Sequence, residues 1–576
     1  MVSLDWTTLV SQQNPLTSLQ LGLALRQRLR QGYDRNDLTK DAIAGLTVGV
    51  VAIPISMALA IAAGVAPQYG LYTAAISGLI MALSGGSRFT ISGPTAAFVV
   101  ILLPIVQQFG AAGLLLATMM AGAILCVMAF ARLGRLVEYI PQGVIQGFSS
   151  GLALVIVTLQ IKDFFGFAID QQMPAFYFDK VVLLASHLNT IHLPTAALGL
   201  FSLGIIYLWP HLNRVIPPHL AAVFFASIVG WWMNQNGWDI ATINSRFFYR
   251  LDDGTVGSGI PPVLPSFEWP WKVAGADLAP DWQTLRTLLP AAFAIAMLGA
   301  IEPLMCAVLL DRITNTRHSA NSELLGQGLG NLIGPLFGAM TGAGAISRSL
   351  VNVSAGATSP LSAVFAAVAV IASLWLLAPL FGYLPMAALA ALLVHIGLTL
   401  LAPKKLWAML RHSPRADTYV LMLCFALTIV FDLIIGITAG VLLAAILLMK
   451  DMANQTALVE IAEDQRVKDK VAGYAVFKVK GPLFFAAADR VFDQVASLLE
   501  QPRGVILHMD GVPLLDAGGL AALERLLSFA DANQYQLLIA DWQAQPLQAL
   551  EKSGMPVNLR RHFYPTLQSA IDAVRH

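Results

Sequence analysis

Long apolar runs separated by short polar breaks follow one another between Ile43 and Met449. A helix crosses a bilayer with about 20 apolar residues, and most of the runs approach that length. With two polar, broken segments counted as passes, the pattern predicts about 14 membrane crossings. The runs are Ile43–Ala62, Tyr69–Leu83, Thr90–Val106, Gly113–Phe130, Gly143–Ile161, Leu193–Trp209, Leu220–Met233, Leu288–Leu310, Leu324–Met340, Leu361–Phe381, Met386–Leu401, Tyr419–Leu433 and Ile434–Met449.

The polar breaks predict how the chain is oriented in the membrane. Residues 234–285 contain no apolar span, carry Asp252 and Asp253, and are expected to form an exposed loop outside the cytoplasm. Lys and Arg accumulate in cytoplasmic loops. If the N-terminus is cytoplasmic, the basic residues of the breaks fall on the cytoplasmic side, and so does the C-terminus. These residues are Arg88, Arg132, Arg135, Arg214, Arg312, Arg317, Lys404, Lys405, Arg411 and Lys450.

Composition agrees with a multi-pass membrane protein in a lipid bilayer. The chain is 57% hydrophobic and only 12% charged, with a mean hydropathy of +0.68. A net charge of +1 gives no reason to expect a nucleic-acid partner. The three cysteines lie inside apolar runs without metal-ligand spacing, so we expect no metal and no cofactor. Residues 1–40 are expected to form a basic cytoplasmic segment, and residues 41–452 the transmembrane domain.

The break between Gly342 and Ser359, GAGAISRSLVNVSAGATS, carries Arg348 in its middle. An arginine at bilayer depth costs about 3 kcal/mol on insertion scales unless it is paired. No acidic residue lies within this break, so a bound anion is one candidate partner. Ser347 and Ser349 flank the arginine, and a helix that begins near Ala345 would direct free N–H groups to the same point. Alternatively, Arg348 anchors a helix end among the lipid headgroups.

The two halves of the membrane region resemble each other weakly. Gly78–Leu83 with Gly85 and Gly86 matches Gly330–Pro335 with Gly338 and Gly342, and each stretch precedes a polar break and a new helix start. Seven passes per half would place the second half upside down relative to the first. Inverted repeats with broken helices are typical of transporters, and paired breaks indicate a midplane site. Ser92 suits a helix N-cap, with Pro94 in the first turn. The half-helices near Ser92 and Ala345 would then face one anion.

Several motifs resemble those of the sulfate permease family of anion transporters, over nearly the whole chain from about residue 35. They are the break at Pro54 with GVAPQYGLYTA (Gly64–Ala74), SGPTAA (Ser92–Ala97), LGAIE (Leu298–Glu302), NSELLGQGLGN (Asn321–Asn331), ISRS (Ile346–Ser349) and GATSP (Gly356–Pro360).

The resemblance implies a fold of seven-plus-seven inverted repeats, divided into a core and a gate domain. It implies an elevator-like movement of core against gate, a homodimer, and a location in the bacterial inner membrane. The anion site would lie between the third and tenth helices, which are broken. The residues that match these breaks are Ser92, Gly93, Pro94 and Thr95 on one side and Ala345, Ile346, Ser347, Arg348 and Ser349 on the other.

Within the family, the chain most resembles the enterobacterial C4-dicarboxylate transporters. Many members carry a glutamine after the first-helix proline and an aromatic residue four positions later, where this chain has Ile55 and Leu59. An apolar wall beside an arginine suits an organic carboxylate with a short carbon chain. We therefore expect transport of a succinate-, fumarate- or aspartate-type dicarboxylate, coupled to protons. The alternative is sodium-coupled transport of bicarbonate or sulfate.

Glu302 is a second charge within an apolar run. A carboxylate at bilayer depth can load and release a proton, because burial disfavours its ionised form. The resemblance implies that this position serves cation coupling, by a proton or by sodium. A pairing of the carboxylate with a neighbouring basic group, for packing alone, is the other interpretation.

From about residue 453 the composition changes, and residues 453–576 predict a small α/β domain. Tyr474–Lys480, Val505–Met509 and Leu537–Ala540 favour strands, and Ala488–Leu499 and Leu520–Ala532 favour helices. The segment Asp516, Ala517, Gly518, Gly519 resembles the phosphorylation loop of the cytoplasmic STAS domain that ends most members of the family. Ala517 replaces the acceptor serine, so a phosphoswitch cannot operate there. The glycines suit a tight turn, and binding of a nucleotide or a cytoplasmic protein is the alternative.

Two functional classes therefore stay open. The first is a secondary active anion transporter that the STAS domain assembles or regulates. The second is a passive anion channel, or a membrane sensor that signals through the STAS domain. Glu302 favours the first, because a channel has no need of a titratable group beside its site. We expect no enzyme, since the soluble part offers no nucleophile–base pair and no metal-ligand cluster.

Overall fold

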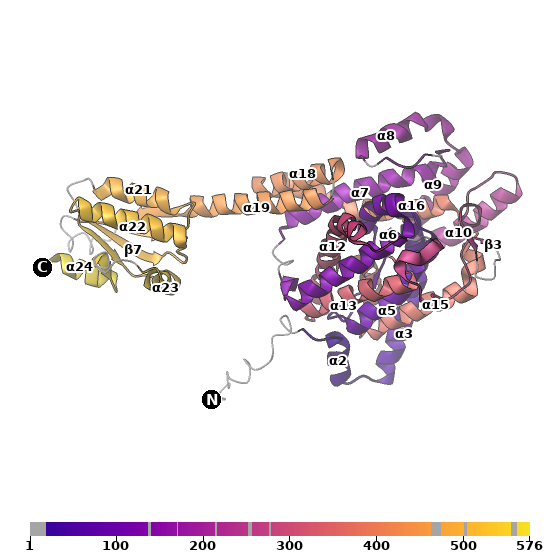
Figure 1. Cartoon of the computed structure of the whole chain (residues 1–576), viewed down its shortest axis with the longest axis horizontal. Helices are drawn as coiled ribbons and strands as arrows, with labels where there is room; N and C mark the ends of the chain where they lie inside the picture. The colour runs from indigo at the N-terminus through magenta and orange to yellow at the C-terminus, as the bar shows by residue number, and fades with distance from the viewer. Residues whose placement is uncertain are drawn as a thin grey trace. The chain divides into compact units, whose positions relative to one another are not determined.

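A computed structural model describes residues 19–135, 140–169, 171–174, 176–213, 216–250, 256–275, 278–431, 433–461, 474–499, 504–554 and 561–575 (Figure 1). Asp252, Asp253 and Arg214, which the sequence analysis assigned to loops, lie outside these residues. The chain divides into two compact units, Met1–Val441 and Leu442–His576. Each unit is described separately.

Helices of the first unit form two groups that pack mainly within themselves. The first group consists of α3 (Arg35–Ala62), α4 (Pro67–Tyr72), the π-helix η2 (Thr73–Ser77), α5 (Gly78–Ser84), α6 (Ala96–Phe130), α12 (Trp282–Thr314), α13 (Ala320–Ile333), α14 (Ile346–Ser354) and α15 (Leu361–Phe381). The second consists of α7 (Gln142–Phe165), α9 (Leu193–Leu212), α10 (Pro218–Gln235), α16 (Met386–Leu401) and α18 (Arg415–Val430).

Shorter elements connect these helices or lie at their edges. They are α2 (Leu23–Arg30), α8 (Tyr177–Ser186), α17 (Pro403–His412) and the 3₁₀ turns η4 (Leu188–Thr190) and η6 (Gly334–Phe337). In the part of the chain that the structure describes, eight helical stretches are long and apolar enough to cross a membrane. The other predicted passes coincide with shorter or broken helices. The predicted runs Thr90–Val106 and Gly113–Phe130 lie largely in one kinked helix, α6. The kink is at Gly110, which has a φ of 66°.

Two short strands bring the broken helices together. Strand β1 (Ser92–Gly93) precedes α6, and strand β4 (Ala343–Gly344) precedes α14. They pair antiparallel, with Ser92 opposite Gly344 and Gly93 opposite Ala343. Segments about 250 residues apart in the chain thus share backbone hydrogen bonds inside the protein, where unpaired N–H and C=O groups would be costly.

The beginning of α3 is tied to the turn before α15 by Asp41, which is fully buried. Its carboxylate accepts hydrogen bonds from the backbone N–H groups of Thr358 (2.6 Å) and Ser359 (3.1 Å) and from the Tyr33 hydroxyl (2.9 Å). Burial and the hydrogen bond to Asp41 raise the pKa of Tyr33 to about 12, which favours the protonated phenol that donates to Asp41. Thr358 and Ser359 belong to the GATSP motif, which therefore has a structural role: it binds Asp41 of α3 just before α15 begins.

The segment 234–285 differs from the simple exposed loop that its polarity predicted. Its described parts contain α11 (Ile243–Arg246), the hairpin β2 (Phe248–Arg250) and β3 (Val256–Ser258), and the 3₁₀ turn η5 (Pro270–Gly275). Ile243 and Ile260 are buried in the main apolar cluster. Apolar residues scattered among polar ones thus fold the segment back onto the helices.

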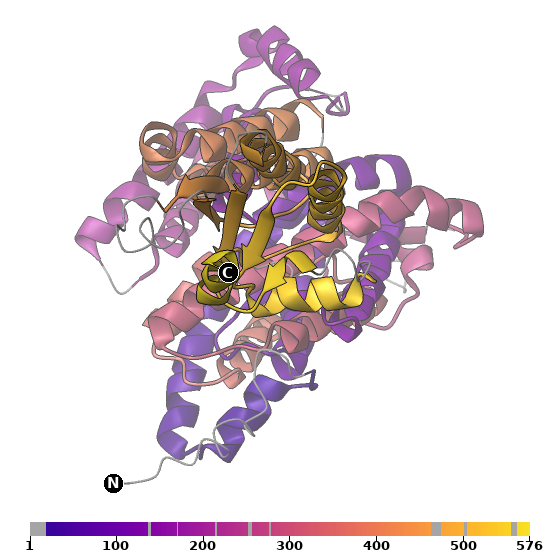
Figure 2. The same ribbon diagram turned by 90° about the vertical axis from the view of Figure 1, so that its left-hand side faces the viewer.

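The second unit is an α/β domain whose sheet has the order β5-β6-β7-β8-β9 (Figure 2). β5 (Ala457–Glu460) is antiparallel to β6 (Tyr474–Lys480), whereas β7 (Gly504–Gly511), β8 (Leu537–Ala540) and β9 (Phe563–Tyr564) continue the sheet in parallel. One face packs on α21 (Ala488–Leu499), α22 (Ala517–Ala532) and α23 (Ala544–Lys552), and the other on α24 (Leu567–Arg575).

Helix α19 (Leu433–Gln455) begins in the first unit and ends in the second. Its residue Ala453 packs against Phe484 and Ala487 of the α/β domain. The domain boundary at residue 453 stays a prediction.

We predict that Gly122→Ala destabilises the first unit. Helices α6 and α13 approach so closely that a Cβ at Gly122 would lie 2.4 Å from the Leu332 nitrogen and 2.7 Å from the Asn331 carbonyl carbon. Backbone atoms cannot move aside as a side chain does, so overpacking should cost about 1–3 kcal/mol. Thermal unfolding of the detergent-solubilised protein measures this.

Gly204→Ala is the matched control, because nothing lies within 4 Å of the added methyl on α9. An unchanged unfolding temperature for Gly122→Ala would contradict the close packing of α6 on α13.

Candidate anion-binding site

The strand pair β1–β4 places the first turns of α6 and α14 next to each other. Thr95 is the N-cap residue of α6 and Ala345 that of α14, and neither side chain caps its helix. First-turn N–H groups of a helix have no intrahelical partners and carry partial positive charge. The helix start near Ala345 is thus confirmed, and both starts are suited to an anion.

Ser92 is not the N-cap that its residue type predicted. It lies in strand β1, and helix α6 begins only at Ala96. Pro94 disfavours a helical conformation in the residue before it, and the backbone of Ser92 and Gly93 is used for pairing with β4. The cap position therefore moves to Thr95.

Arg348 is almost completely buried, with 2% of its surface exposed. Its Nη2 donates a hydrogen bond to the Pro94 carbonyl at 2.6 Å, which links α14 to the start of α6. Its Nη1 is buried and has no hydrogen-bond partner. Headgroup anchoring of Arg348 is therefore excluded, and a charged donor is left available between the two helix starts.

Glu302 lies on α12, within electrostatic reach of Arg348 but without a direct ion pair to it. One carboxylate oxygen, Oε2, accepts a hydrogen bond from the Thr95 hydroxyl at 2.8 Å. Thr95 thus connects the acid to the start of α6 instead of capping that helix. The basic group within electrostatic reach of Glu302 is Arg348, so both readings of Glu302, cation coupling and packing, stay predictions.

A buried polar chain behind β1 was not assigned a role from the sequence. Gln327 on α13 donates through Nε2 to Ser92 Oγ at 3.1 Å and to Glu323 Oε1 at 2.9 Å. Glu323 also accepts from the N–H groups of Gly86 and Ser87, both at 2.9 Å. The sequence signal for this chain was the spacing of Glu323 and Gln327, two polar residues one helical turn apart at the start of a Gly-rich apolar run.

The remaining predicted residues have different surroundings. Ser349 is buried, but its hydroxyl donates to the Ala345 carbonyl (2.7 Å) and accepts from the Ile91 N–H (2.9 Å), so it holds the turn together. Ser347 is exposed, and Ile346 packs beside Phe89 and Cys306. Ser349 thus has a structural role, and its role as an anion ligand stays a prediction.

A small cavity of about 10 Å³ lies against Arg348 and Ser92. That volume holds about one water molecule. Apart from Ser92 and Arg348 its lining residues are apolar, and the predicted wall residues Ile55 and Leu59 are not among them. Ile55 and Leu59 are buried in the main apolar cluster instead. The lining consists of Ala52, Ala74, Gly78, Ile91, Ser92, Arg348, Ala363, Ala366 and Val370.

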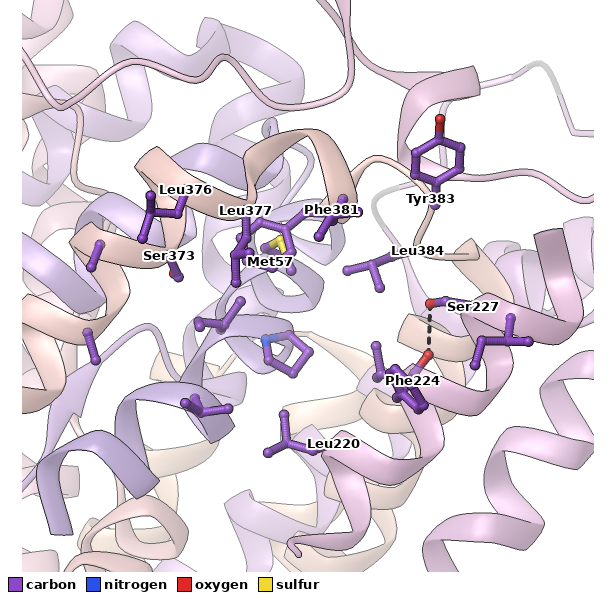
Figure 3. A pocket seen from close by; sticks show the side chains of 18 of the residues that line it. Met57, Leu220, Phe224, Ser227, Ser373, Leu376, Leu377, Phe381, Tyr383 and Leu384 are labelled. Atoms are coloured by element: carbon purple, nitrogen blue, oxygen red, sulfur yellow. Dashed lines mark hydrogen bonds between the residues drawn. The ribbon is translucent and has the colours of Figure 1, made fainter. Parts of the chain in front are cut away.

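A larger cavity of about 880 Å³ lies between α3, α10 and α15, and Figure 3 shows its lining. Its side chains are almost all aliphatic or aromatic. The hydroxyls of Ser227 and Ser373 donate to carbonyls of their own helices, those of Val223 (2.8 Å) and Val370 (2.7 Å). No charged residue lines this cavity, so it is unsuited to an anion.

In the α/β domain, Asp516 is the N-cap of α22 and accepts a hydrogen bond from the Gly519 N–H at 2.7 Å. Ala517 is exposed, and a Cβ on Gly518 would lie 2.7 Å from that of Phe485. The turn residues Asp516, Ala517, Gly518 and Gly519 thus have a structural explanation in helix capping and close packing. No group of metal-ligating side chains occurs among the residues that the structure describes.

A comparison with protein-family models identifies two regions. Residues 38–424 match the model of the sulfate permease family, which is about two thirds of the chain. The chain belongs to the sulfate permease family. Residues 465–570 match the STAS domain, in agreement with the α/β fold of the second unit. The family consists of transporters, so the chain is a multi-pass anion transporter.

Relatives extend this likeness over nearly the whole chain. "Putative sulfate transporter YvdB" of Bacillus subtilis is 34% identical over 545 residues, which cover 93% of this chain and 97% of that protein. Bicarbonate transporter BicA of Picosynechococcus sp. is 28% identical over 540 residues, covering 89% and 90%. These names favour the inorganic-oxyanion alternative over the expected C4-dicarboxylate.

Solved structures confirm the predicted fold class. The transmembrane domain of a cyanobacterial BicA is 27% identical and covers 72% of this chain and 98% of that chain, with a TM-score of 0.59. SLC26A9 shares 18% identity and covers 96% and 92%, with a TM-score of 0.81. The transmembrane region and the STAS domain thus each have a fold that is known from solved structures.

We predict that Gly93→Ala displaces the Arg348 side chain. A Cβ at Gly93 would lie 2.7 Å from Nη1, so the guanidinium must move away from the Pro94 carbonyl. A hydrogen bond of a charged group contributes about 1.5–3 kcal/mol, so anion affinity should fall about 10-fold or more. Equilibrium binding of labelled sulfate and of labelled bicarbonate to the purified protein measures it.

Gly299→Ala on α12 is the control, since its added methyl comes no closer than 3.3 Å to a side chain. Equal affinities in both variants would mean that the position of Arg348 does not matter for anion binding.

Proposed function

We propose that this sulfate permease is a secondary active transporter of a small inorganic oxyanion, bicarbonate or sulfate, coupled to a cation at Glu302. The observation that carries the proposal is the β1–β4 pair. It holds two uncapped helix N-termini together around the buried Arg348. The N–H groups and the partial positive charges of both helix starts add to the full charge of the guanidinium.

In this proposal, Arg348 is the main anion ligand and the Ser92 hydroxyl is a second donor. The free Nη1 binds the anion while Nη2 stays on the Pro94 carbonyl. Gly93 allows the guanidinium to lie directly against the backbone, because any side chain there would collide with it. Thr95, Pro94 and Ala345 position the two helix starts.

Two considerations support a compact inorganic anion over the dicarboxylate. The named relatives are sulfate and bicarbonate transporters. The cavity beside Arg348 holds about one water molecule, so a small oxyanion requires less enlargement of it than a four-carbon diacid.

Glu302 is proposed as the cation site. A carboxylate in a membrane-spanning helix is costly when ionised and unpaired, so a proton or a sodium ion would accompany it across the bilayer. The Thr95 hydroxyl donates to one oxygen of Glu302 beside the start of α6, so a cation bound there would lie near the proposed anion. The opposite charges would then cross together.

Transport is proposed to occur by an elevator-like movement of the first helix group, as core, against the second, as gate. We place the N- and C-termini in the cytoplasm and the chain in the bacterial inner membrane, on the distribution of Lys and Arg. A homodimer, and a cytoplasmic protein that binds the STAS domain, are proposed partners.

We predict that Arg348→Ala abolishes uptake and weakens anion binding by about 100-fold, since it removes a charge and a forked donor. Arg348→Lys keeps the charge but loses the planar fork, and should weaken binding about 10-fold. The assay is uptake of labelled bicarbonate, sulfate, succinate, fumarate and aspartate into proteoliposomes, with set pH and sodium gradients.

Arg312→Ala, which removes an exposed cation on the same unit, should behave as wild type. Wild-type binding by folded Arg348→Ala would refute the site. Succinate uptake without sulfate or bicarbonate uptake would overturn the proposed substrate class, and uptake that never exceeds equilibrium would indicate a channel.

We predict that Glu302→Gln binds and exchanges the anion but no longer concentrates it. Glutamine keeps the size and can hydrogen-bond Thr95, but it is permanently neutral. Separate pH and sodium gradients imposed on wild-type and variant proteoliposomes identify the coupling ion. If the variant concentrates the anion as well as wild type does, the coupling site lies elsewhere.

A further inference from the structure

We propose that Gln327 is a positioning residue that turns the Ser92 hydroxyl into a hydrogen-bond donor for the transported anion. The inference rests on the proposed function of the Arg348 site. Gln327 lies on α13, outside the two half-helices, and is 1% exposed.

The orientation of the Gln327 amide is set by Glu323. Glu323 accepts three hydrogen bonds, from the N–H groups of Gly86 and Ser87 and from Gln327 Nε2. The two backbone N–H groups both bind Oε2, and Oε1 faces the Gln327 amide. An ionised carboxylate has no hydrogen to give, so its partner must be a donor. The NH₂ end of Gln327 must therefore face Glu323, and the carbonyl end must face away.

The same NH₂ group carries a second hydrogen, and Ser92 Oγ lies 3.1 Å from Nε2. Since the amide nitrogen can only donate, the serine oxygen accepts this bond. A hydroxyl has one hydrogen, and that of Ser92 is left to donate elsewhere. Ser92 lines the same cavity as Arg348, so its O–H and the free Nη1 of Arg348 can bind one anion.

Packing alone does not explain a glutamine at this position. Its Oε1 is buried without a hydrogen-bond partner, which is unfavourable. An apolar side chain of similar length, such as methionine, would fill the space without leaving an orphaned carbonyl. The glutamine is explained if its NH₂ group is needed to orient Ser92 toward the anion.

A double-mutant cycle tests the inference. Gln327→Met, Ser92→Ala and the double variant are prepared in the full-length protein, and binding of labelled sulfate and of labelled bicarbonate is measured for each. A neutral hydrogen bond corresponds to a change in affinity of about 3- to 10-fold. We expect each single variant to weaken binding by about that factor, and the double variant to bind no more weakly than Ser92→Ala.

Non-additivity is the signature of a residue that acts through Ser92. If Gln327→Met weakens binding by the same factor whether or not Ser92 is present, Gln327 acts through the general structure and the inference is overturned. Unchanged affinity in Gln327→Met likewise overturns it.

A matched control exists in the second helix group. Gln146 on α7 is buried and donates through Nε2 to Ser150 Oγ at 3.2 Å, an interaction of the same type away from the site. Gln146→Met should leave anion affinity unchanged. A loss equal to that of Gln327→Met would mean that any buried Gln–Ser bond affects binding, which contradicts the inference.

Gln327→Glu is the second variant, in case methionine impairs folding. It has nearly the same shape, but its carboxyl group carries at most one hydrogen and cannot serve both Glu323 and Ser92. It should weaken binding at least as much as Ser92→Ala does, and wild-type affinity would refute the inference.

Arg348→Ala, assayed in parallel, separates this inference from the proposed function. If Arg348→Ala loses anion binding and Gln327→Met does not, only the role of Gln327 is wrong. If Arg348→Ala keeps wild-type affinity, or wild type binds neither anion, the proposed site fails and the role of Gln327 fails with it.

Discussion

The burial of Arg348 between two half-helices constrains the whole membrane unit. A permanently charged group at this depth is tolerated only when protein donors and acceptors replace water around it. Nη2 of Arg348 donates a hydrogen bond to the Pro94 carbonyl oxygen at 2.6 Å. The paired strands β1 and β4 bring these two groups together. The two-residue strands thereby join the first and second halves of the chain at the point where charge is held.

Close backbone packing makes this arrangement possible. Gly122 and Gly328 let α6 and α13 approach each other, and Gly85 and Gly326 do the same for α5 and α13. Small residues at helix contacts are characteristic of membrane proteins, where packing instead of the hydrophobic effect drives association. Side-chain hydroxyls of the π-helix η2 add hydrogen bonds to this packing. The Ser77 hydroxyl donates to the Gly330 carbonyl, and the Thr73 hydroxyl donates to the Met340 carbonyl.

Buried polar residues of the first helix group bind the backbone of its turns and short strands. Asp41 holds the start of α15, Glu323 and Gln327 support β1, and Asn331 bonds both backbone groups of Gly342 just before β4. Each of these buried groups fixes a turn or a strand that would otherwise leave backbone groups unpaired. In the proposed mechanism, the first helix group would carry the anion as it moves against the second.

The sequence by itself determined the elements whose signal is local. Apolar length predicted α15 and α16 with the observed bounds. Alternation of apolar and polar residues predicted β6, and a short apolar run predicted β8, because burial of a strand is recorded by neighbouring residues. It also singled out Arg348 and Glu302, since isolated charges in apolar runs need partners. Only the tertiary structure decided what surrounds them. The pairing of Ser92 with Gly344, the bond from Thr95 to Glu302 and the support from Gln327 join residues more than 200 positions apart. Local sequence carries no such long-range information, so the N-cap prediction for Ser92 was wrong. For the same reason the sequence does not show that Ala52 and Ala366 line the cavity. Residue type shows which hydrogen bonds a side chain can make, but the fold determines which partner lies within hydrogen-bond distance.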